Sequence, residues 1–540
     1  MLALTDQPDG ESIARDVFGS RVAYVPYTIP GFALAESVAD VFDKNREVEG
    51  LVLLQHGIFS VGESAREAYE RMIVLVTLAE ERLAKGRKSF APATLPKELA
   101  RTVEIAPIIR GACAIARDKA GTMKRQILAF RTSPSILEYV NGAELSRYSQ
   151  AGVVTPDHTI RTKNWPLLLP APVAHEFDEW KAAVEKGVSD FVARYHDYFT
   201  RNNARAEPKK TELDPYPRVA LVPGKGLFGL GASAKDAAVA ADIAENTIEV
   251  IADAEAIGRY QPIAEADMFD VEYWSLEQAK LGKAAEKPLA RQVAVITGGG
   301  SGIGAATAKA MARAGAEVAV LDRDRAMAST VARECGKTAI ALACDVTKVK
   351  DVQSAFRHAV KAFGGVDIVV SNAGAAWQGA IGNVDDETLR QSFELNFFAH
   401  QTVAQAAVAI MKAQGTGGCL LFNVSKQAVN PGRDFGPYGL PKASTLFLMK
   451  QYALDHGRDG IRSNAVNADR VRTGLLTDSM IASRSQARGL SEKDYMSANL
   501  LGREVTAEDV ADAFVFLATA SKTTAAILTV DGGNIEASLR

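Results

Sequence analysis

The chain has 540 residues, of which 47% are hydrophobic and 24% charged, and its formal net charge is −3. This length is too great for one ordinary domain, and the near balance of charge gives no reason to expect nucleic acid or a membrane surface as a partner. No apolar run approaches the roughly 18 residues that cross a bilayer, and the acidic start lacks the pattern of a secretory signal. Four scattered cysteines show neither metal-ligand spacing nor a disulfide framework. We therefore expect a cytoplasmic protein with more than one domain.

Two segments of the first half share a pattern. Residues 55–68 read QHGIFSVGESAREA and residues 224–237 read GKGLFGLGASAKDA, an offset of 169 positions (226 − 57). Each follows a predicted apolar strand, 51–54 or 219–222, and each opens an alanine-rich helix. Two independent turns could share these residue types, because a serine in each copy makes a reasonable N-cap. Twelve aligned positions with conservative matches favour a duplication, so we infer two related α/β units.

His56 precedes the first shared glycine, where the second copy has Lys225. A lone histidine is usually structural. However, residues 51–73 resemble the class II aldolase/adducin family, in which the histidine of a His-Gly-x-x-x-x-Gly segment is one of three zinc ligands. Residues 22–38 are similar to the segment that precedes this histidine. The resemblance implies that zinc would polarise the ketone carbonyl of a sugar phosphate during carbon–carbon cleavage.

The sequence does not contain the rest of this metal site. The other two ligands of the family form a His-x-His pair well ahead of the third, but the chain contains no His-x-His. We therefore expect the first unit to be truncated, and His56 alone cannot hold a catalytic metal. In the second unit His158 lies 67 residues before Lys225 (225 − 158), close to where the pair would fall. His158 with Arg161 and Lys163 is either a remnant phosphate or metal site or an ordinary loop.

Irregular segments suggest the domain boundaries. Residues 202–217 interrupt the first half, and residues 279–289 form a small, charged connector after the strand-poor segment 260–278. The predicted divisions are a class II aldolase/adducin-like region over 1–205, the remainder of its second unit with the connector over 206–285, and a further domain over 286–540.

A glycine-rich turn joins a strand to a helix at the start of this last domain. Residues 293–304 read VAVITGGGSGIG, and residues 305–314 predict a helix. Side-chain-free residues let a pyrophosphate approach the backbone, and the helix N-terminus offers free N–H groups and a positive dipole end. A lone glycine motif is weak evidence, because glycine-rich turns join many strands to helices. The features that follow it give this motif its weight.

An acid ends the next predicted strand, 316–322. Asp322 lies 18 residues beyond Gly304 (322 − 304), where a carboxylate accepts hydrogen bonds from both ribose hydroxyls of NAD and repels the 2′-phosphate of NADP. Arg323 and Arg325 favour NADP instead, since a guanidinium can hold that phosphate. The glycine loop carries no basic residue, so we predict NAD and interpret Asp322 as a cofactor ligand rather than a turn residue.

Two further apolar strands also end in polar residues. Residues 339–345 end in Asp345, just before Val346, and residues 367–374 read DIVVSNAG, a strand that runs into a turn. In a parallel sheet the loops at the carboxyl ends of the strands line one crevice. We therefore expect these residues to meet the same ligand as the glycine loop.

A serine, a tyrosine and a lysine follow in register. Residues 419–425 predict a strand that delivers Ser425 to the crevice, Tyr438 comes 13 residues later, and Lys442 lies four beyond it. That spacing places the last two on one helix face, and Pro441 indicates that Tyr438 sits at or before the first turn. An adjacent ammonium and the nicotinamide charge favour the phenolate and lower the pKa of the phenol. The tyrosine could then exchange a proton with a substrate hydroxyl while hydride passes to the nicotinamide, and Ser425 would hold the same oxygen. Taken alone, a Tyr-x-x-x-Lys pair is usually an ordinary helix surface.

With these motifs, residues from about 288 to 540 resemble a short-chain dehydrogenase/reductase. The family's Thr-Gly-x-x-x-Gly-x-Gly loop is matched by TGGGSGIG, its Asn-Ala-Gly signature by residues 372–374, and its last strand and turn by residues 529–533. The resemblance implies an α/β fold with a doubly wound, seven-stranded parallel sheet of the Rossmann type, NAD(P) chemistry, and dimers or tetramers. The implied catalytic residues are Asn396, Ser425, Tyr438 and Lys442. The implied cofactor-binding residues are Thr297, Gly298, Gly300, Ser301, Gly302, Ile303, Gly304, Asp322, Asp345, Val346, Asn372, Ala373, Gly374, Tyr438, Lys442 and Thr473.

One departure from the family lies after the strand that precedes the substrate lid. Residues 464–473 read NAVNADRVRT, with Ala468-Asp469 where the family usually has Pro-Gly. Thr473 remains the candidate for binding the carboxamide of the nicotinamide. Substrate specificity is expected in a mobile lid over residues 474–501 and near Ser425. The residues singled out there are Arg484, Arg488, Gln427 and Arg433.

The order of the domains resembles bifunctional proteins that fuse a rhamnulose-1-phosphate-type aldolase to a short-chain dehydrogenase. In that family the aldolase releases lactaldehyde and dihydroxyacetone phosphate, and the dehydrogenase half is associated with lactaldehyde oxidation. The leading hypothesis is an NAD-dependent oxidoreductase of a small hydroxy or aldehyde sugar metabolite, lactaldehyde-like, fused to an aldolase-like region without a complete zinc site, and forming a homo-oligomer. A second hypothesis retains zinc-dependent aldol cleavage, with His56 completed by residues of another chain. A third makes the first half an oligomerisation module.

Overall fold

The computed structural model describes residues 1–86, 90–116, 123–282 and 285–533. The chain forms two compact units. The first comprises residues 1–101, 129–231 and 236–284, and the second comprises residues 102–128, 232–235 and 285–540. Over the described ranges, no helix combines the length and the apolar character that crossing a membrane requires.

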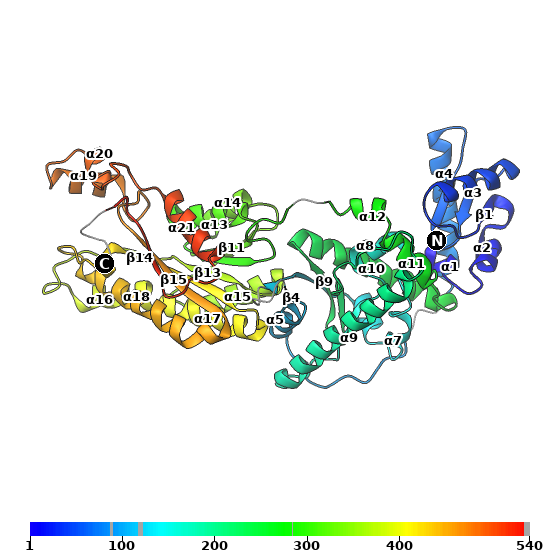
Figure 1. Ribbon diagram of the computed structural model, residues 1–540, viewed down its shortest axis with the longest axis horizontal. Coiled ribbons are helices and arrows are strands. Elements are labelled where there is room, and N and C mark those ends of the chain that lie inside the picture. Colours follow the sequence, from blue (N-terminus) through cyan, green and yellow to red (C-terminus); the bar gives the residue numbers. More distant parts are fainter. Residues whose placement is uncertain (87–89, 117–122, 283–284, 534–540) are drawn as a thin grey trace. The chain divides into compact units, whose positions relative to one another are not determined.

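The first part of unit 1 is a three-stranded sheet flanked by helices (Figure 1). Strand β1 pairs in parallel with β2, and β2 pairs antiparallel with β3. Phe18, Val52 and Leu75 are fully or almost fully buried in the core between this sheet and its helices. The elements are α1 (Leu2–Thr5), α2 (Gly10–Phe18), β1 (Val22–Val25), α3 (Phe32–Lys44), β2 (Gly50–Leu53), β3 (Gly57–Ser60) and α4 (Ala65–Leu83).

The second part of unit 1 is built on a sheet with the order β6-β9-β8-β7. Alanines of α10 pack on the apolar residues of β8 and β9, because their small side chains let the helix lie close to the sheet. The main elements are β6 (Ile127–Arg131), α6 (Pro134–Val140), α7 (Leu145–Tyr148), α8 (Thr159–Thr162), β7 (Leu167–Leu168), α9 (Phe177–Asn203), β8 (Val219–Val222), β9 (Gly226–Gly231), α10 (Ala234–Ile257), α11 (Glu265–Glu272) and α12 (Ser275–Ala279).

The two copies of the sequence repeat have the same local geometry. In each copy the strand turns back as an antiparallel hairpin before the helix starts, and the pair Leu53↔Gly57 of the first copy corresponds to Val222↔Gly226 of the second. Each turn needs a left-handed residue at the same place, Gln55 with φ 58° and Gly224 with φ 77°. The sequence predicted one strand and one helix per copy, and the structure adds the second strand of each hairpin.

Unit 2 contains a seven-stranded, all-parallel sheet with the order β12-β11-β10-β13-β14-β15-β16, which confirms the doubly wound fold. The strand order reverses between β10 and β13, so loops on either side of this point border a crevice. The central strands β10 and β13 are buried along their whole length, which explains their apolar sequences, whereas the edge strands β12 and β16 are only partly buried. The strands are β10 (Val293–Thr297), β11 (Glu317–Asp322), β12 (Ile340–Ala343), β13 (Ile368–Ser371), β14 (Gly418–Ser425), β15 (Ile461–Ala468) and β16 (Ile527–Val530).

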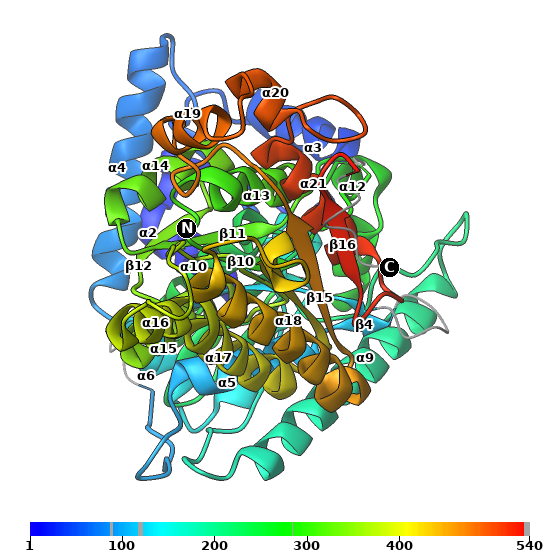
Figure 2. The same ribbon diagram turned by 90° about the vertical axis from the view of Figure 1, so that its left-hand side faces the viewer.

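Helices cover both faces of this sheet (Figures 1 and 2). One face carries α13, α14 and α21, and the other carries α15, α17 and α18. Two short helices, α19 and α20, lie in the lid between β15 and α21. The helices are α13 (Gly302–Arg313), α14 (Arg325–Cys335), α15 (Val349–Phe363), α16 (Asp386–Phe393), α17 (Ala399–Gln414), α18 (Gly436–His456), α19 (Asp478–Gln486), α20 (Glu492–Met496) and α21 (Ala507–Thr519).

Helix α5 (Thr102–Ala112) is also built into unit 2, although it precedes the sheet by almost two hundred residues in sequence. Its Arg110 makes a bidentate, fully buried ion pair with Asp367 at the start of β13, at 2.9 and 2.7 Å. Arg125 approaches the same carboxylate at 3.0 Å. A Cβ on Gly111 would collide with the carbonyl oxygen of Gln414, so α5 approaches α17 more closely than a larger residue would permit.

Candidate active site

The glycine loop forms a tight backbone cradle between β10 and α13. Gly298 has a φ of 61°, and a Cβ there would lie 3.0 Å from the Cα of Ala373 in the neighbouring loop. A Cβ on Gly304 would collide with the carbonyl oxygen of Gly298. Both positions therefore require glycine, and Ser301 precedes the first turn of the helix. The exposed backbone and the helix N-terminus fit the pyrophosphate of a dinucleotide.

Asp322 ends β11 beside this cradle. Its Oδ2 accepts a hydrogen bond from the Gly300 N–H at 3.0 Å, and its Oδ1 accepts one from the Asp324 N–H. A Cβ on Gly300 would lie 2.9 Å from that Oδ2, so glycine lets the carboxylate reach the loop. Arg323 and Arg325, which favoured NADP in the sequence, are both exposed. The group beside the cradle is thus a carboxylate, which can accept hydrogen bonds from ribose hydroxyls.

The carboxyl-terminal parts of β10 and β14 and the loop after β13 are joined by hydrogen bonds of two asparagine side chains. Asn372 donates from Nδ2 to the Thr297 carbonyl at 3.0 Å, and its backbone N–H donates to the Thr297 hydroxyl at 2.9 Å. Asn423 donates from Nδ2 to the Asn372 Oδ1 at 2.7 Å. The sequence analysis missed Asn423, although a signal was present: it lies two residues before Ser425 and so shares a face of the strand with it.

At the other edge of the site, Asp345 and Thr473 occupy defined places. The Thr347 hydroxyl donates to the Asp345 carboxylate at 2.6 Å, and this bond holds the pKa of Asp345 below its usual value. Val346 is buried next to it. Thr473 lies against the first turn of α13, where a Cβ on Gly302 would be 3.2 Å from its own Cβ. The loop after β15 therefore reaches the glycine loop.

Tyr438, Ser425 and Lys442 converge where β14 ends and α18 begins. Tyr438 is the third residue of α18, close to the helix start as Pro441 indicated. Burial raises the pKa of Tyr438, a hydrogen bond with Ser425 offsets part of the increase, and the resulting pKa is about 12. Burial lowers the pKa of Lys442 to about 8. Its Nζ donates to the Asn423 carbonyl at 2.9 Å and lies 5.8 Å from the centre of the Tyr438 ring. The expected lowering of the phenol pKa is thus outweighed by desolvation in this geometry.

Asn396 lies in a π-helical turn, Glu394–Phe398, between α16 and α17. Its Nδ2 donates to the Ala375 carbonyl at 2.8 Å, and its own carbonyl accepts a hydrogen bond from Thr445 of α18 at 2.6 Å. A Cβ on Gly374 would lie 2.8 Å from the Asn396 Oδ1 and 3.5 Å from the Lys442 Nζ. Gly374 therefore allows Asn396 and Lys442 to approach the loop after β13. Single-turn π segments of this kind often mark functional positions.

His400, which the sequence analysis did not single out, lies one helical turn beyond Asn396. Its Nδ1 is 2.6 Å from the Ser371 hydroxyl at the end of β13. Complete burial, with a smaller contribution from the Lys442 charge, holds the pKa of His400 well below its usual value. The ring is therefore neutral at neutral pH and braces the strand end that leads into Asn372. A lone histidine in a helix gave no sequence signal for this contact.

The candidate metal position in unit 1 is His56, which has no second metal ligand beside it among the residues that the structure describes. His56 occupies the turn between β2 and β3, and its buried Nδ1 has no hydrogen-bond partner in the part of the chain that the structure describes. Over the same residues there is no group of three or more histidine, cysteine, aspartate or glutamate side chains that could hold a metal ion. A zinc site needs at least three protein ligands, so the donor set around His56 does not fit one.

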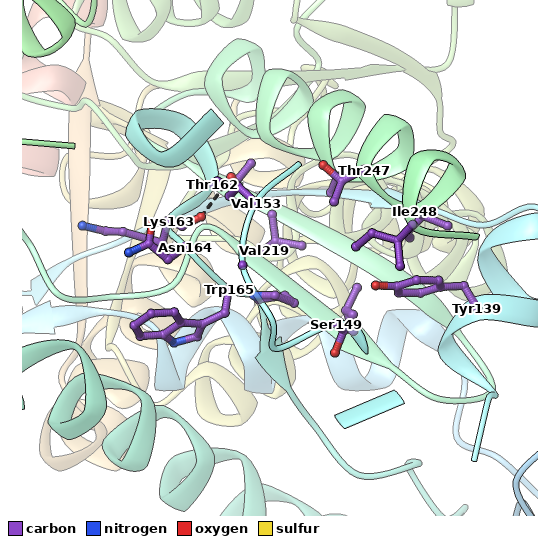
Figure 3. A pocket seen from close by; sticks show the side chains of 15 residues that line it. Tyr139, Ser149, Val153, Thr162, Lys163, Asn164, Trp165, Val219, Thr247 and Ile248 are labelled. Atoms are coloured by element: carbon purple, nitrogen blue, oxygen red, sulfur yellow. Dashed lines mark hydrogen bonds between the residues drawn. The ribbon is translucent and has the colours of Figure 1, made fainter. Parts of the chain in front are cut away.

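Of the three basic residues singled out in the second unit, His158, Arg161 and Lys163, the last is held in a buried ion pair. Lys163 is buried and pairs with Glu272 at 3.3 Å, and its Nζ lies 4.0 Å from the centre of the Tyr195 ring. Burial lowers the pKa of His158. Figure 3 shows Lys163 and Asn164 at one side of a pocket whose other walls include Tyr139, Val219 and Ile248. These contacts favour the interpretation of this segment as an ordinary structural loop.

Comparison with known proteins accounts for nearly the whole chain. Three family models match, described as the class II aldolase and adducin N-terminal domain over residues 2–83, the second domain of class II aldolase over residues 100–281, and enoyl-(acyl carrier protein) reductase over residues 298–534. The oxidoreductase YuxG of Bacillus subtilis (strain 168), itself uncharacterized, is 34% identical, with 97% of this chain and 78% of that protein covered.

Two further relatives match the second half. The L-rhamnose 1-dehydrogenase (NAD(P)(+)) of Sphingomonas sp. (strain SKA58) is 34% identical over 46% of this chain and 97% of its own length. A crystal structure of 3-ketoacyl-(acyl-carrier-protein) reductase from Brucella melitensis, complexed with NADH, is 32% identical, covering 45% of this chain and 97% of that one, with a TM-score of 0.42.

Proposed function

Because the chain belongs to the family of oxidoreductases that join class II aldolase/adducin domains to a short-chain dehydrogenase, we propose that it is an NAD-dependent dehydrogenase of a small, sugar-derived hydroxy compound or aldehyde of the lactaldehyde kind. The observation that carries the proposal is the convergence of Ser425, Tyr438 and Lys442 beside a glycine cradle at the carboxyl ends of the parallel strands. A relative that acts on L-rhamnose supports the choice of a sugar-derived substrate.

In this proposal Tyr438 moves the proton of the reaction. During oxidation of an alcohol, the phenolate accepts the proton of the substrate hydroxyl while the carbon gives up a hydride, and a carbonyl forms. Ser425 donates a hydrogen bond to the same substrate oxygen. The Lys442 ammonium, whose Nζ donates to the Asn423 carbonyl, is proposed to favour the phenolate form of Tyr438 by its positive charge. When bound, NAD supplies the acceptor for the hydride and a positive charge near the phenol.

The preference for NAD over NADP rests on Asp322. Its carboxylate lies at the rim of the glycine cradle, hydrogen-bonded to Gly300, where it would meet the ribose of the adenosine half. A 2′-phosphate would be repelled there. The residues proposed to hold the cofactor are those of the glycine loop with Asp322, Asp345, Val346, Asn372–Gly374, Tyr438, Lys442 and Thr473.

No metal-dependent step is proposed for the aldolase-like region. His56 lacks companion ligands among the described residues, so the chemistry that zinc would supply has no donor set to support it there. We assign this half of the chain to structure rather than to carbon–carbon cleavage.

We also propose that the protein is a homo-oligomer. Leu440, Phe447 and Leu454 follow one another at intervals of seven residues and so lie on one face of α18. Phe447 is 70% exposed and Leu454 is 77% exposed. Leu440, on the same helix, and Phe398, at the end of the π-helical turn before α17, are also exposed. A row of large apolar side chains on one surface helix favours contact with a second copy.

The proposal is tested with the full chain and a panel of lactaldehyde, short diols and aldoses, each assayed with NAD. We expect at least one member to support NAD reduction by the wild type. Replacement of Tyr438 by phenylalanine removes only the hydroxyl, so activity should fall about 10²–10⁴-fold while affinity for NADH stays unchanged. Retained activity in Tyr438→Phe would remove this residue from its proposed role.

A further inference from the structure

Ala468-Asp469 stands where the family usually has Pro-Gly, and Asp469 joins two parts of the dehydrogenase site. Ser425 and Ala468 are directly paired in the register of β14 and β15, so the residues that follow them emerge side by side. There the Lys426 Nζ donates to the Asp469 Oδ2 at 2.7 Å. The Asp469 side chain is only 10% exposed, and that of Lys426 is 22% exposed. Such a sheltered pair is less weakened by solvent and salt than a surface pair.

The Lys426 end of this pair belongs to the turn that fixes Ser425. Lys426 begins a short 3-10 turn, Lys426–Ala428, whose N-cap is Ser425. The Ser425 Oγ accepts a hydrogen bond from the Gln427 N–H at 3.3 Å. The position of the serine hydroxyl thus depends on the conformation of this turn, and the turn is held by the carboxylate of Asp469.

The other end of the cluster reaches the lid, which comprises residues 474–501. The Arg470 Nε lies 3.5 Å from the same Oδ2 of Asp469. Arg470 has a left-handed backbone with φ 50°, and it donates from Nη1 to the Tyr495 carbonyl at 2.8 Å. Its guanidinium also lies 5.0 Å from the centre of the Tyr495 ring. Tyr495 is part of α20 and is buried in the small core of the lid with Leu476, Ile481 and Met496.

We propose that Asp469 is a positioning residue that couples the lid to the turn carrying Ser425. One carboxylate oxygen is shared between a cation of the serine turn and a cation that grips the lid, so movement of either changes the electrostatic environment of the other. A lid that has closed over a substrate then also holds the serine hydroxyl in place. The inference rests on the proposed function, because it assigns a role to groups around the same site.

The alternative is a local ion pair that only closes the end of the sheet. The two interpretations predict different effects of a change at Lys426. If the ion pair is only local, the lid should not respond to the change; if Asp469 couples the turn to the lid, the lid should open more readily. Lid opening can be followed by the rate at which trypsin cleaves after Arg484 and Arg488, measured by mass spectrometry on the full chain with and without NADH. NADH affinity is measured separately by fluorescence titration.

We expect Asp469→Asn and Lys426→Met each to raise the rate of lid cleavage about tenfold. In the double variant the lid should be cleaved no faster than in Asp469→Asn alone. Lys426→Arg and Asp469→Glu keep the charges and should stay close to the wild type. The matched control is Asp459→Asn, which removes a carboxylate that pairs with Lys412 and His456 before the start of β15. It should leave lid cleavage unchanged.

Lid cleavage in Lys426→Met at the wild-type rate would overturn the coupling, and so would additive effects in the double variant. If Asp469→Asn does not fold, the pair Lys426→Met and Lys426→Arg still decides the question. Failure of the wild type to bind NADH would reject the proposed function instead, and the cleavage rates without NADH would still report on the ion cluster.

Discussion

At the scale of single residues, burial sets the charges of the catalytic pair. Tyr438 and Lys442 lie in a desolvated site, and burial moves their pKa values in opposite directions, to about 12 and about 8. The sequence predicted which residues would meet, because a spacing of four on a helix is a local property. It did not predict the direction of the phenol pKa, because desolvation depends on the surrounding fold, which an i,i+4 pattern does not contain.

Because its ammonium is buried, Lys442 should lower the free energy of unfolding. Its folded-state pKa lies below the value near 10.4 of an unfolded lysine, so the full cost is present below pH 8 and is relieved as the pH rises from 8 to 10.4. Lys442→Met should therefore abolish activity and yet raise the free energy of unfolding at pH 7, by about 2 kcal/mol after loss of the Asn423 hydrogen bond.

This prediction is checked by the Tm of the transition that NADH shifts in the wild type, followed at pH 7 and at pH 10 in both proteins. The difference in Tm between Lys442→Met and wild type should shrink at the higher pH. A variant that is less stable than wild type at pH 7 would contradict this account of the lysine.

At the scale of elements, the strands of the parallel sheet could be predicted from the sequence, but the packing of α5 beside this sheet could not. Except for β15, the strands of unit 2 are largely apolar runs with a glycine or a polar residue at or within two positions of their carboxyl ends, and both features are local in sequence. Helix α5 is different, because its contact with β13 joins residues 257 positions apart. Nothing in the sequence around Arg110 or around Asp367 predicts that these two residues form a pair. A buried, bidentate pair of this kind is visible only in three dimensions.

Removal of one member of this pair should be more damaging than removal of both. Arg110→Met leaves Asp367 buried with Arg125 as its remaining charged partner among the described residues, and we expect the Tm of the NADH-shifted transition to fall by the equivalent of about 3 kcal/mol. Adding Asp367→Leu should restore part of the loss, because the buried carboxylate is then gone, although Arg125 loses its ion pair and the Val293 N–H loses its acceptor.

Arg390→Met is the matched control in the same unit, because Arg390 pairs with Asp386 on the surface, where both side chains are more than 80% exposed. It should change stability by less than about 0.5 kcal/mol. If Arg110→Met were equally mild, α5 would not be an integral part of the dehydrogenase unit.

At the scale of the whole molecule, the chain combines a duplicated aldolase-like region with one dehydrogenase site. The repeat could be predicted from its offset of 169 residues, and the two hairpins then proved to be equivalent down to the left-handed residue of each turn. The spacing of residues in the sequence could not show that Lys163 forms an ion pair with Glu272.

Assembly should depend on the apolar face of α18. The change Phe447→Asp with Leu454→Asp places two charges on that face, so the oligomer should dissociate to a monomer with its fold retained. The mass is measured by light scattering on a size-exclusion column. Leu276→Asp, at an exposed leucine of α12 in the other unit, is the control and should leave the mass unchanged. A wild type that runs as a monomer, or a double variant that keeps its mass, would contradict the proposal.

The most direct test of the central claim is a calorimetric titration of the full chain with NADH and, separately, with NADPH. The glycine cradle and Asp322 predict one NADH site per chain and weaker binding of NADPH, because the carboxylate repels a 2′-phosphate. Tighter binding of NADPH would contradict the role given to Asp322. If neither nucleotide binds, the site around Tyr438 is not a dehydrogenase site.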